Sequence, residues 1–189
     1  EYEYMDAVEF SPVEGIFKQN PRNGQFERFD FWFKLVPWEY VAEEEELAQI
    51  LTQLVRERKV VILNPAYTLL FQSKAILKVL WELFPNHPLL LATGEQPLPA
   101  KSWVEKVLFG REGANVRVLD AGGRTTIEAD GEYGDQPRVY QEFVEFPKDA
   151  AGNHYQAGVF FAGEGCGLGY RRGGTILDNT AQFCGHVIE

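Results

Sequence analysis

The feature that most constrains the fold is a change of pattern at a linker rich in proline and glycine, Thr93 to Ala100. Before the linker, apolar residues recur at helical spacing; beyond it, short extended stretches alternate with glycine-containing turns. Helices that come first and strands that dominate later favour an α+β fold over a doubly wound parallel sheet. We therefore expect a mixed α/β lobe over residues 1–100 and a β-rich lobe over residues 101–189.

Two helices are predicted in the first lobe. The first has acidic residues (Glu43 to Glu46) in its first turns and basic residues at its end, as the helix dipole favours, around the amphipathic repeat Leu47, Ile50, Leu51, Leu54 and Val55. The acidic run is thereby explained as a solvated helix start and requires no metal. The second helix is capped by Ser73 and ends before Pro85, because proline disfavours helix for the residue before it.

Strands are predicted on both sides of the linker. Phe29, Phe31, Phe33 and Leu35 alternate with Arg28, Asp30, Trp32 and Lys34, the period-2 pattern of a strand with one polar face. The other expected strands, the later ones forming an antiparallel meander, are Val60–Leu63, Val104–Leu108, Asn115–Leu119, Arg124–Glu128, Arg138–Val144, Tyr155–Phe161 and Leu168–Arg172. The glycine-rich run from Gly165 to Gly169 lies between two of them and is expected to be a hairpin turn.

Composition excludes several classes of protein. A chain of 189 residues with 45% hydrophobic content can bury a core without a disulfide or a metal. The net charge of −10 argues against a nucleic-acid partner, which requires a basic face, but is compatible with a small phosphorylated ligand held by a few cations. No apolar run has the length of a membrane span, and no signal-peptide pattern opens the chain.

Two further details concern the origin of the chain. It has two cysteines, Cys166 and Cys184, without a CxxC pattern, which is typical of a reduced cytoplasmic protein; one disulfide between them is the alternative. It begins with Glu1 rather than methionine, and we expect it to be a piece of a larger polypeptide.

The stretch from Lys106 to Val116 is the strongest candidate for a binding site. It consists of an expected strand, a loop with Gly110 and Gly113, and a second strand. Both glycines can adopt positive φ, which lets backbone N–H groups approach an anion closely. Lys106 and Arg111 add positive charge, so a phosphate-bearing ligand is one interpretation and an ordinary hairpin is the other.

Other cations extend this candidate site. Lys74 lies at an expected helix start, and Arg171 lies beside a glycine-containing turn. The alternative is that these side chains are scattered surface cations. GxSxG, HExxH, P-loop and GxGxxG-after-strand patterns are all missing from the sequence, which argues against the enzyme classes that depend on them.

Several motifs resemble those of glutathionylspermidine synthases and their uncharacterised relatives. Lys106 to Val116 is similar to their K-P-L-x-G-R-E-G-x-N-V stretch, and Phe33 to Tyr40 is similar to F-K-L-Y-P-W-E-W. Ser73 to Leu77 with Leu80 to Pro88 is similar to N-K-A-I-L…L-W-E-L-F-P-N-H-P. The resemblance extends over nearly the whole chain, because further motifs follow in the expected order: Tyr140 to Phe143, Gly167 to Arg171, and Asp178 to Thr180.

This resemblance implies an ATP-grasp-like fold and an ADP-forming carboxylate–amine ligase. In that family ATP phosphorylates a glutathione-like carboxylate, and an amine or polyamine attacks the acyl phosphate. Carried over to this sequence, Lys74, Lys106 and Arg171 would contact ATP phosphates, and Arg111 would stabilise charge on the transferring phosphoryl group as the catalytic residue. The hinge that receives adenine would be Gln141, Glu142, Phe143 and Val144.

The departures from the family pattern concern the metal and the end of the chain. The family's Mg²⁺ ligands lie in an R-x-D followed by E-x-N, and no Glu-x-Asn occurs in this chain. Arg28-Phe29-Asp30 has the first form but comes too late in the order, so we interpret it as strand and expect the metal ligands upstream of residue 1. Gln182, Cys184 and Gly185 replace the usual residues of the closing stretch.

Three hypotheses therefore stay open from the sequence. The chain is the nucleotide-binding part of such a ligase, inactive by itself without the upstream metal ligands and most of the substrate groove. Alternatively it is a non-catalytic nucleotide-binding or interaction module on the same scaffold. The third possibility is a β-rich binding domain whose cations are incidental.

Overall fold

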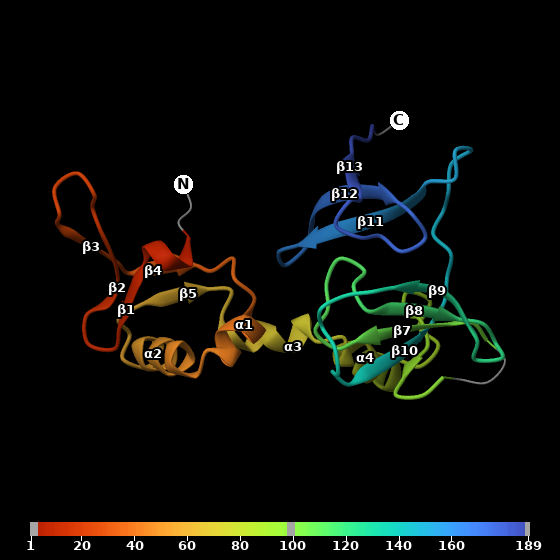
Figure 1. Cartoon of the computed structure of the whole chain (residues 1–189), viewed down its shortest axis with the longest axis horizontal. Coiled ribbons are helices and arrows are strands. Elements are labelled where there is room, and N and C mark those ends of the chain that lie inside the picture. The colour runs from red at the N-terminus through yellow and green to blue at the C-terminus, as the bar shows by residue number, and fades with distance from the viewer. Residues whose placement is uncertain (1–3, 98–100, 188–189) are drawn as a thin grey trace. The chain divides into compact units, whose positions relative to one another are not determined.

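A computed structural model describes residues 4–97 and 101–187, and the chain divides into two compact units, residues 1–72 and 73–189 (Figure 1). The division falls between Gln72 and Ser73 along the chain, at the expected start of the second helix. The lobe boundary expected at residue 100 stays a prediction, and residues 98–100 of the linker lie outside the described part of the chain.

The first unit contains two small sheets and two main helices. The antiparallel sheet has the order β1 (Glu9–Ser11), β2 (Gly15–Gln19) and β3 (Phe26–Phe29). β4 (Phe31–Phe33) pairs in parallel with β5 (Val61–Leu63), and α1 (Trp38–Glu43) and α2 (Glu45–Arg56) connect them. The short elements are η1 (Met5–Ala7), η2 (Ala66–Thr68) and α3 (Leu69–Gln72).

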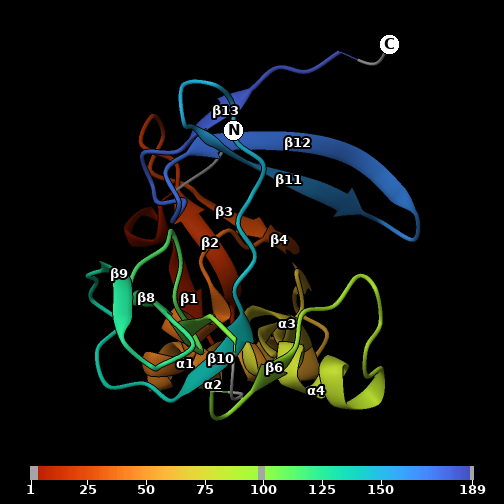
Figure 2. The same ribbon diagram turned by 90° about the vertical axis from the view of Figure 1, so that its right-hand side faces the viewer.

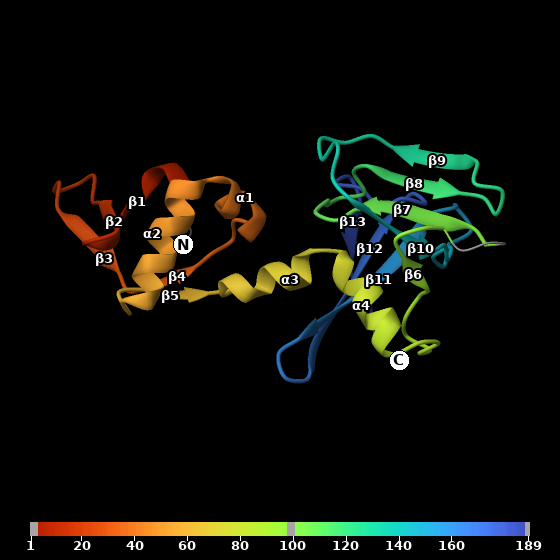
Figure 3. The same ribbon diagram turned by 90° about the horizontal axis from the view of Figure 1, so that it is seen from below.

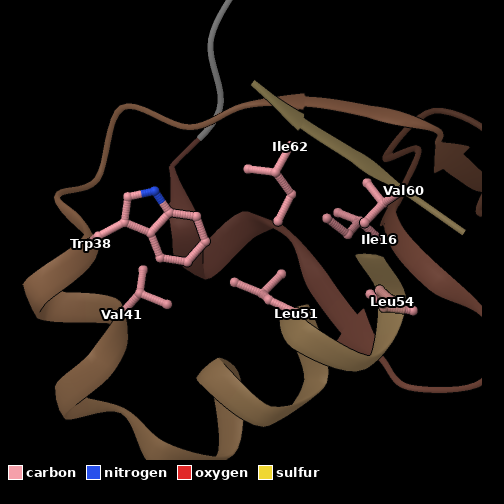
Figure 4. Packing of buried hydrophobic residues seen from close by; sticks show 7 residues of the cluster. All are labelled: Ile16, Trp38, Val41, Leu51, Leu54, Val60 and Ile62. Atoms are coloured by element: carbon pink, nitrogen blue, oxygen red, sulfur yellow. The ribbon is translucent and has the colours of Figure 1, made fainter. Parts of the chain in front are cut away.

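The apolar stripe of α2 builds the core of this unit, as the sequence predicts. Leu51 and Leu54 are completely buried and point toward the strands, together with side chains from α1 (Figure 4). The whole cluster is Ile16, Trp38, Val41, Leu51, Leu54, Val60 and Ile62. α1 was not predicted from the sequence; it has only six residues, and Pro37 is the residue that precedes it.

The strand expected over Phe29 to Leu35 is interrupted at Asp30, and the face that it buries is the opposite of the one that the alternation predicts. Phe31 and Phe33 are 69% and 59% exposed, while Lys34 is only 3% exposed. Parallel pairing places Trp32 beside Ile62, which belongs to the core. The pairing with a strand thirty positions away therefore decides which side faces inward.

Burial of Lys34 has an electrostatic consequence. Its ammonium group donates a hydrogen bond to the Val36 carbonyl and lies 4.3 Å from the ring centroid of Trp38. Removal from water disfavours the charged form and lowers the pKa of Lys34 to about 8.

The second unit contains a five-stranded sheet and a three-stranded sheet. The larger sheet has the order β6-β10-β7-β8-β9, and Figure 3 shows β9, β8, β7 and β10 side by side in that sequence. Its strands are β6 (Thr93–Gly94), β7 (Trp103–Val107), β8 (Val116–Leu119), β9 (Thr125–Ala129) and β10 (Arg138–Glu142). The smaller sheet contains β11 (His154–Phe161), β12 (Gly165–Gly173) and β13 (Gln182–Cys184). Mostly antiparallel sheets with few helices confirm the expected α+β class.

α4 (Ala75–Leu83) lies beside β6 (Figure 2). The helix ends two residues before Pro85, as expected. Ser73 is not the N-cap residue itself, which is Lys74, but the Ser73 hydroxyl accepts a hydrogen bond from the Ala75 amide at 3.3 Å. Lys74 is thereby held at the first turn of the helix.

Two strand predictions in this unit are wrong in detail. The meander is broken, because β10 inserts between β6 and β7 and pairs with all five residues of β7. The run from Gly165 to Gly169 is strand, not turn; the hairpin reverses over residues 162–164. A β-carbon at Gly167 would lie 3.3 Å from the Phe160 ring, so the glycine makes room for the aromatic side chain opposite.

Candidate nucleotide-binding cavity

A cavity of about 480 Å³ lies within the second unit. β7, β8 and the end of β10 contribute to its wall, together with the start of α4, the loop after β7 and the segment after β12. Its charged and amide-bearing lining residues are Lys74, Lys106, Arg111, Glu112, Gln141, Glu142 and Gln156. Phe143 and Val144 line the cavity as well, so seven of the eight residues expected to bind ATP line this one cavity.

Strand pairing places Lys106 and Gln141 on the same face of the sheet. Gln141 of β10 is paired with Val104 of β7, and side chains alternate along each strand, so Val104, Lys106 and Gln141 share a face. Trp103, Glu105 and Val107 alternate with them and are almost completely buried. The alternation of β7 thus separates a buried face from a face that carries the cation.

Lys106 is a desolvated cation whose ammonium group is held by a neighbouring side chain. Its ammonium group donates a hydrogen bond to Oε1 of Gln141 at 2.8 Å. Burial, and to a smaller extent the positive charge of Lys74, lower the pKa of Lys106 to about 8. The ammonium of Lys74 is therefore close enough to act on that of Lys106.

Lys74 is held from another element. Its ammonium group donates a hydrogen bond to the Gly110 carbonyl at 2.5 Å, and its amide donates to the Leu108 carbonyl at 3.0 Å. Burial lowers the pKa of Lys74 as well. Among the described residues no carboxylate lies within ion-pair distance of either lysine, so two partly desolvated cations face the cavity without a protein anion between them.

The loop between β7 and β8 depends on its glycines for two different reasons. Gly113 has φ of 72°, and a β-carbon there would also lie 2.6 Å from Cγ2 of Ile176. Gly110 does not adopt positive φ, in contrast to the expectation from sequence; it is needed for space, because a β-carbon would lie 2.5 Å from Cγ2 of Val107. Asn115 closes the loop by accepting from the Tyr133 amide and donating to the Gly131 carbonyl.

The expected hinge follows β10. The strand ends at Glu142, earlier than predicted, and Phe143 and Val144 continue along the cavity. The amides of Glu142 and Phe143 already donate to the carbonyls of Ala92 and Ser102, at 2.8 and 2.9 Å. The Glu142 carboxylate is paired with Lys101 at 2.7 Å.

Arg171 is the predicted site residue that lies outside the lining of the cavity. It is on β12, paired with Gln156 of β11, and Gln156 does line the cavity. Its guanidinium donates to the Asp178 carbonyl at 2.9 Å and lies 5.6 Å from the ring centroid of Phe183. These contacts direct the side chain of Arg171 toward β13 and toward the segment that joins β12 to β13.

Several lining residues were not predicted from the sequence. They form the apolar part of the wall or come from the segment after β12: Leu91, Val104, Val118, Phe146, Thr175, Ile176 and Leu177. The valines of β7 and β8 could have been found from their alternation with charged residues. The segment 175–177 carries no such signal, since it reaches the cavity through a long-range contact with Gly113.

The described residues contain no group of three or more His, Cys, Asp or Glu side chains that could hold a metal ion. Arg28 and Asp30, which have the R-x-D form, make an exposed ion pair at 3.3 Å, and Arg28 also donates to the Lys59 carbonyl. Cys166 and Cys184 are both free thiols. No helix among the described residues is long and apolar enough to cross a membrane.

Comparison with known proteins identifies the family. The model of the glutathionylspermidine synthase preATP-grasp family matches residues 1–189. The chain belongs to this family. The expected resemblance is thereby confirmed, and the mixed α/β structure with mostly antiparallel sheets is consistent with an ATP-grasp-like fold.

Relatives in this family include ligases. The chain is 34% identical, over 82% of its length, to a Haemophilus influenzae protein named as a putative acid–amine ligase. It is 30% identical, over 63% of its length, to the bifunctional glutathionylspermidine synthetase/amidase of Escherichia coli. It is 29% identical, over half of its length, to the trypanothione synthetase of Crithidia fasciculata. The matched regions span only 40%, 20% and 15% of these relatives.

Proposed function

We propose that this chain is the nucleotide-binding part of an ADP-forming acid–amine ligase of the glutathionylspermidine synthase type, with ATP bound in the cavity of the second unit. The observation that carries the proposal is the pair Lys74 and Lys106, two partly desolvated ammonium groups that face one cavity with Arg111. Like charges brought together out of water are unfavourable unless an anion compensates them. A polyphosphate supplies that compensation.

The rest of the lining suits the remainder of a nucleotide. Val104, Val116 and Val118 provide an apolar wall for a flat base, and the segment from Gln141 to Val144 runs beside it. Because the amides of Glu142 and Phe143 are already used within the protein, polar contacts to adenine would come from the Val144 amide or from carbonyl groups of this segment. The proposed hinge therefore has fewer backbone amides available to adenine than the sequence alone suggests.

Arg111 is the proposed catalytic residue. It follows Gly110, whose carbonyl holds Lys74, so the loop couples the arginine to the phosphate-binding lysine. Phosphoryl transfer is catalysed mainly by positioning and by cations placed where charge develops. Arg111 would stabilise the phosphoryl group as it passes to the carboxylate, which then loses phosphate when an amine attacks the acyl phosphate.

Arg171 has a different proposed role from the three cavity cations. Its bond to the Asp178 carbonyl directs it to the segment that follows β12, and its partner Gln156 is the residue of this sheet that lines the cavity. Contact of Arg171 with a phosphate would therefore require that this side chain reorient toward the cavity when the nucleotide binds.

Magnesium does not fit the described residues. The carboxylates that line the cavity are Glu112 and Glu142, and Glu142 is paired with Lys101. No cluster of ligands is present in the described chain. We therefore derive no step through the metal, and we propose that its ligands come from further chain of the enzyme, as they do in the sequence motif of the family.

The substrates proposed by analogy are a glutathione-like carboxylate and an amine or polyamine, since relatives are named as a putative acid–amine ligase, a glutathionylspermidine synthetase/amidase and a trypanothione synthetase. The two free thiols are compatible with the proposed cytoplasmic location. Further chain of the same enzyme would supply most of the substrate groove.

The test is ADP release from ATP by the complete enzyme with glutathione and spermidine as the first acid and amine. Arg111→Ala should reduce the rate by roughly three powers of ten or more, as removal of a transition-state arginine does. Arg124→Ala is the matched control, because this arginine is 83% exposed and lies away from the cavity lining. Full activity of Arg111→Ala would refute the catalytic role; binding of ATP without turnover would favour the non-catalytic module.

A further inference from the structure

Behind Lys106 lies a buried chain of hydrogen bonds that ends on the backbone. The ammonium of Lys106 donates to Oε1 of Gln141 at 2.8 Å, and Nε2 of Gln141 donates to Oγ1 of Thr93 at 3.1 Å. The hydroxyl of Thr93 in turn donates to the Leu91 carbonyl at 3.0 Å. Thr93 and Gln141 are 4% and 8% exposed, so water has little access to this chain.

The direction of each bond in this chain is fixed by donor and acceptor chemistry. The Leu91 carbonyl can only accept, so the one hydroxyl proton of Thr93 is used there and its oxygen is left to accept. The Gln141 group facing Thr93 must then be the NH₂ end. The carbonyl end of Gln141 is thereby directed at Lys106, where an acceptor is required by an ammonium group that has only donors.

We propose that Thr93 is a positioning residue for nucleotide binding, which acts through Gln141 to hold the Lys106 ammonium group toward the phosphates of the ligand. This inference rests on the proposed function, because it assigns a role within the same cavity. Thr93 itself does not line the cavity, and its side chain acts on the ligand only through the amide of Gln141.

The register of the sheet explains why position 93 can serve this role. β6 is short and pairs with β10, and Thr93 is directly opposite Gln141. Paired residues of antiparallel strands point to the same face, so the hydroxyl meets the amide without a change of backbone. Valine has the shape of threonine without the hydroxyl, whereas serine keeps the hydroxyl, so these two substitutions separate hydrogen bonding from packing.

The inference also predicts how the charge of Lys106 responds to pH. A carbonyl directed at the ammonium stabilises the charged form, and its loss lets burial and Lys74 lower the pKa further. The other charged groups that line this cavity are Lys74, Arg111, Glu112 and Glu142. None of them is altered by a substitution at Thr93, so a change in the pH profile reports on the Gln141–Lys106 contact.

The experiment is calorimetric titration of ATP into wild type, Thr93→Val, Thr93→Ser, Lys106→Met and the double variant Thr93→Val/Lys106→Met, at pH values from about 6.5 to 9.5. We expect Thr93→Val to weaken ATP binding about tenfold, the effect of losing one contact to a charged group. Thr93→Ser should bind as wild type does. The midpoint at which affinity falls with rising pH should move to lower pH in Thr93→Val.

The double variant distinguishes positioning from a general packing role. If Thr93 acts through Lys106, adding Thr93→Val to Lys106→Met changes the affinity no further. An equal loss in both backgrounds, or a pH midpoint that does not move, overturns the inference. Should Thr93→Val fail to fold by circular dichroism, Thr93→Ala replaces it with the same expected results.

Failure of the proposed function gives a different pattern. If Lys106→Met binds ATP as tightly as wild type, the cavity is not the phosphate site and the proposed function is wrong. If Lys106→Met binds weakly while Thr93→Val binds normally, the proposed function stands and only the inference about Thr93 is wrong.

Discussion

Lys106 is a buried lysine of the cavity whose protonation should affect both folding stability and nucleotide binding. Its pKa is lowered from 10.5 to about 8, chiefly by burial. Below about pH 8 the ammonium is charged in both the folded and the unfolded protein. Between about 8 and 10.5 the unfolded protein binds more protons, so the contribution of Lys106 to folding stability rises with pH.

The nucleotide affinity should change with pH in the opposite direction. ATP binding requires charged Lys106, so the dissociation constant should increase toward tenfold per pH unit above about pH 8. Titration calorimetry between about pH 7.5 and 9.5 measures this. Lys106→Met should bind weakly with a much flatter profile, whereas Lys34→Met, which removes a lysine of similar pKa from the first unit, should keep the wild-type profile. A wild-type affinity that is constant over this range contradicts the assignment.

Two constraints favour glycine at position 113, the backbone conformation and the lack of space for a side chain. Its φ is 72°, and the space of a β-carbon is occupied by Ile176 and by the Leu177 carbonyl. We expect Gly113→Ala to lower the free energy of unfolding by about 2–4 kcal/mol and to weaken ATP binding by displacing the segment 175–177 from the cavity.

Gly123→Ala is the matched control for that prediction. Gly123 has a similar φ of 81°, but nothing lies within 4 Å of the position of a β-carbon. Only the backbone cost of about 1 kcal/mol should appear in urea unfolding, with unchanged ATP affinity. Equal effects of the two substitutions would show that contact with Ile176 has no energetic importance.

At the scale of elements, β7 has two faces with different tasks. The cavity face carries Lys106, and the opposite face carries Glu105, whose carboxylate is 5% exposed and lies 2.6 and 2.7 Å from Arg117 and Arg138. These contacts join β7 to β8 and β10 on the side away from the cavity. These ion pairs therefore stabilise the pairing of β8, β7 and β10, which positions Lys106.

Removal of the Glu105 carboxylate should therefore destabilise the sheet. Glu105→Ala leaves two arginines without their shared carboxylate, and the expected loss in free energy of unfolding is about 3 kcal/mol, measured with urea. Lys148→Ala breaks a 2.9 Å ion pair with Glu145 whose side chains are both about half exposed, and should cost less than about 1 kcal/mol. A comparable effect from these two substitutions would argue against a structural role for the buried cluster.

At this scale the sequence predicts features that depend on residues close together along the chain. The stripe of α2 and the strands β7 to β12 are local patterns, and they were predicted within a few residues; the short strands β6 and β13 were not predicted. The cations of the cavity were also predicted, because Lys106 and Arg111 lie in one motif and Lys74 is in a second. The sequence did not show that these cations lie close together; in the structure, the strand pairing and the Lys74–Gly110 hydrogen bond bring them to one cavity.

The features that were missed depend on contacts between distant segments. The inward face of β4 is decided by its parallel partner β5, so the alternation of Phe31 and Phe33 gave the wrong side. The insertion of β10 between β6 and β7 broke the expected meander. The contact of residues 175–177 with Gly113 and the direction of Arg171 toward Asp178 are long-range as well. Periodicity contains no information about such contacts.

At the scale of the whole molecule, the core of the first unit and the cavity of the second unit are built from separate parts of the chain. All lining residues of the cavity lie in residues 73–189, and the cluster around Leu54 lies in residues 1–72. Leu54→Ala should lower the stability of the first unit by about 2–5 kcal/mol while leaving the ATP dissociation constant unchanged at temperatures where the protein is folded. A large loss of affinity in this variant would mean that the two units cooperate in binding.

The central claim is that Lys74 and Lys106 form the phosphate-binding end of a nucleotide site. Calorimetric titration of ATP into wild type and into the double variant Lys74→Met/Lys106→Met, at pH 7.5, tests it most directly. Loss of two desolvated contacts to phosphate should raise the dissociation constant by about a hundredfold or more, and circular dichroism should show both proteins folded. Equal dissociation constants in the two folded proteins would contradict the claim.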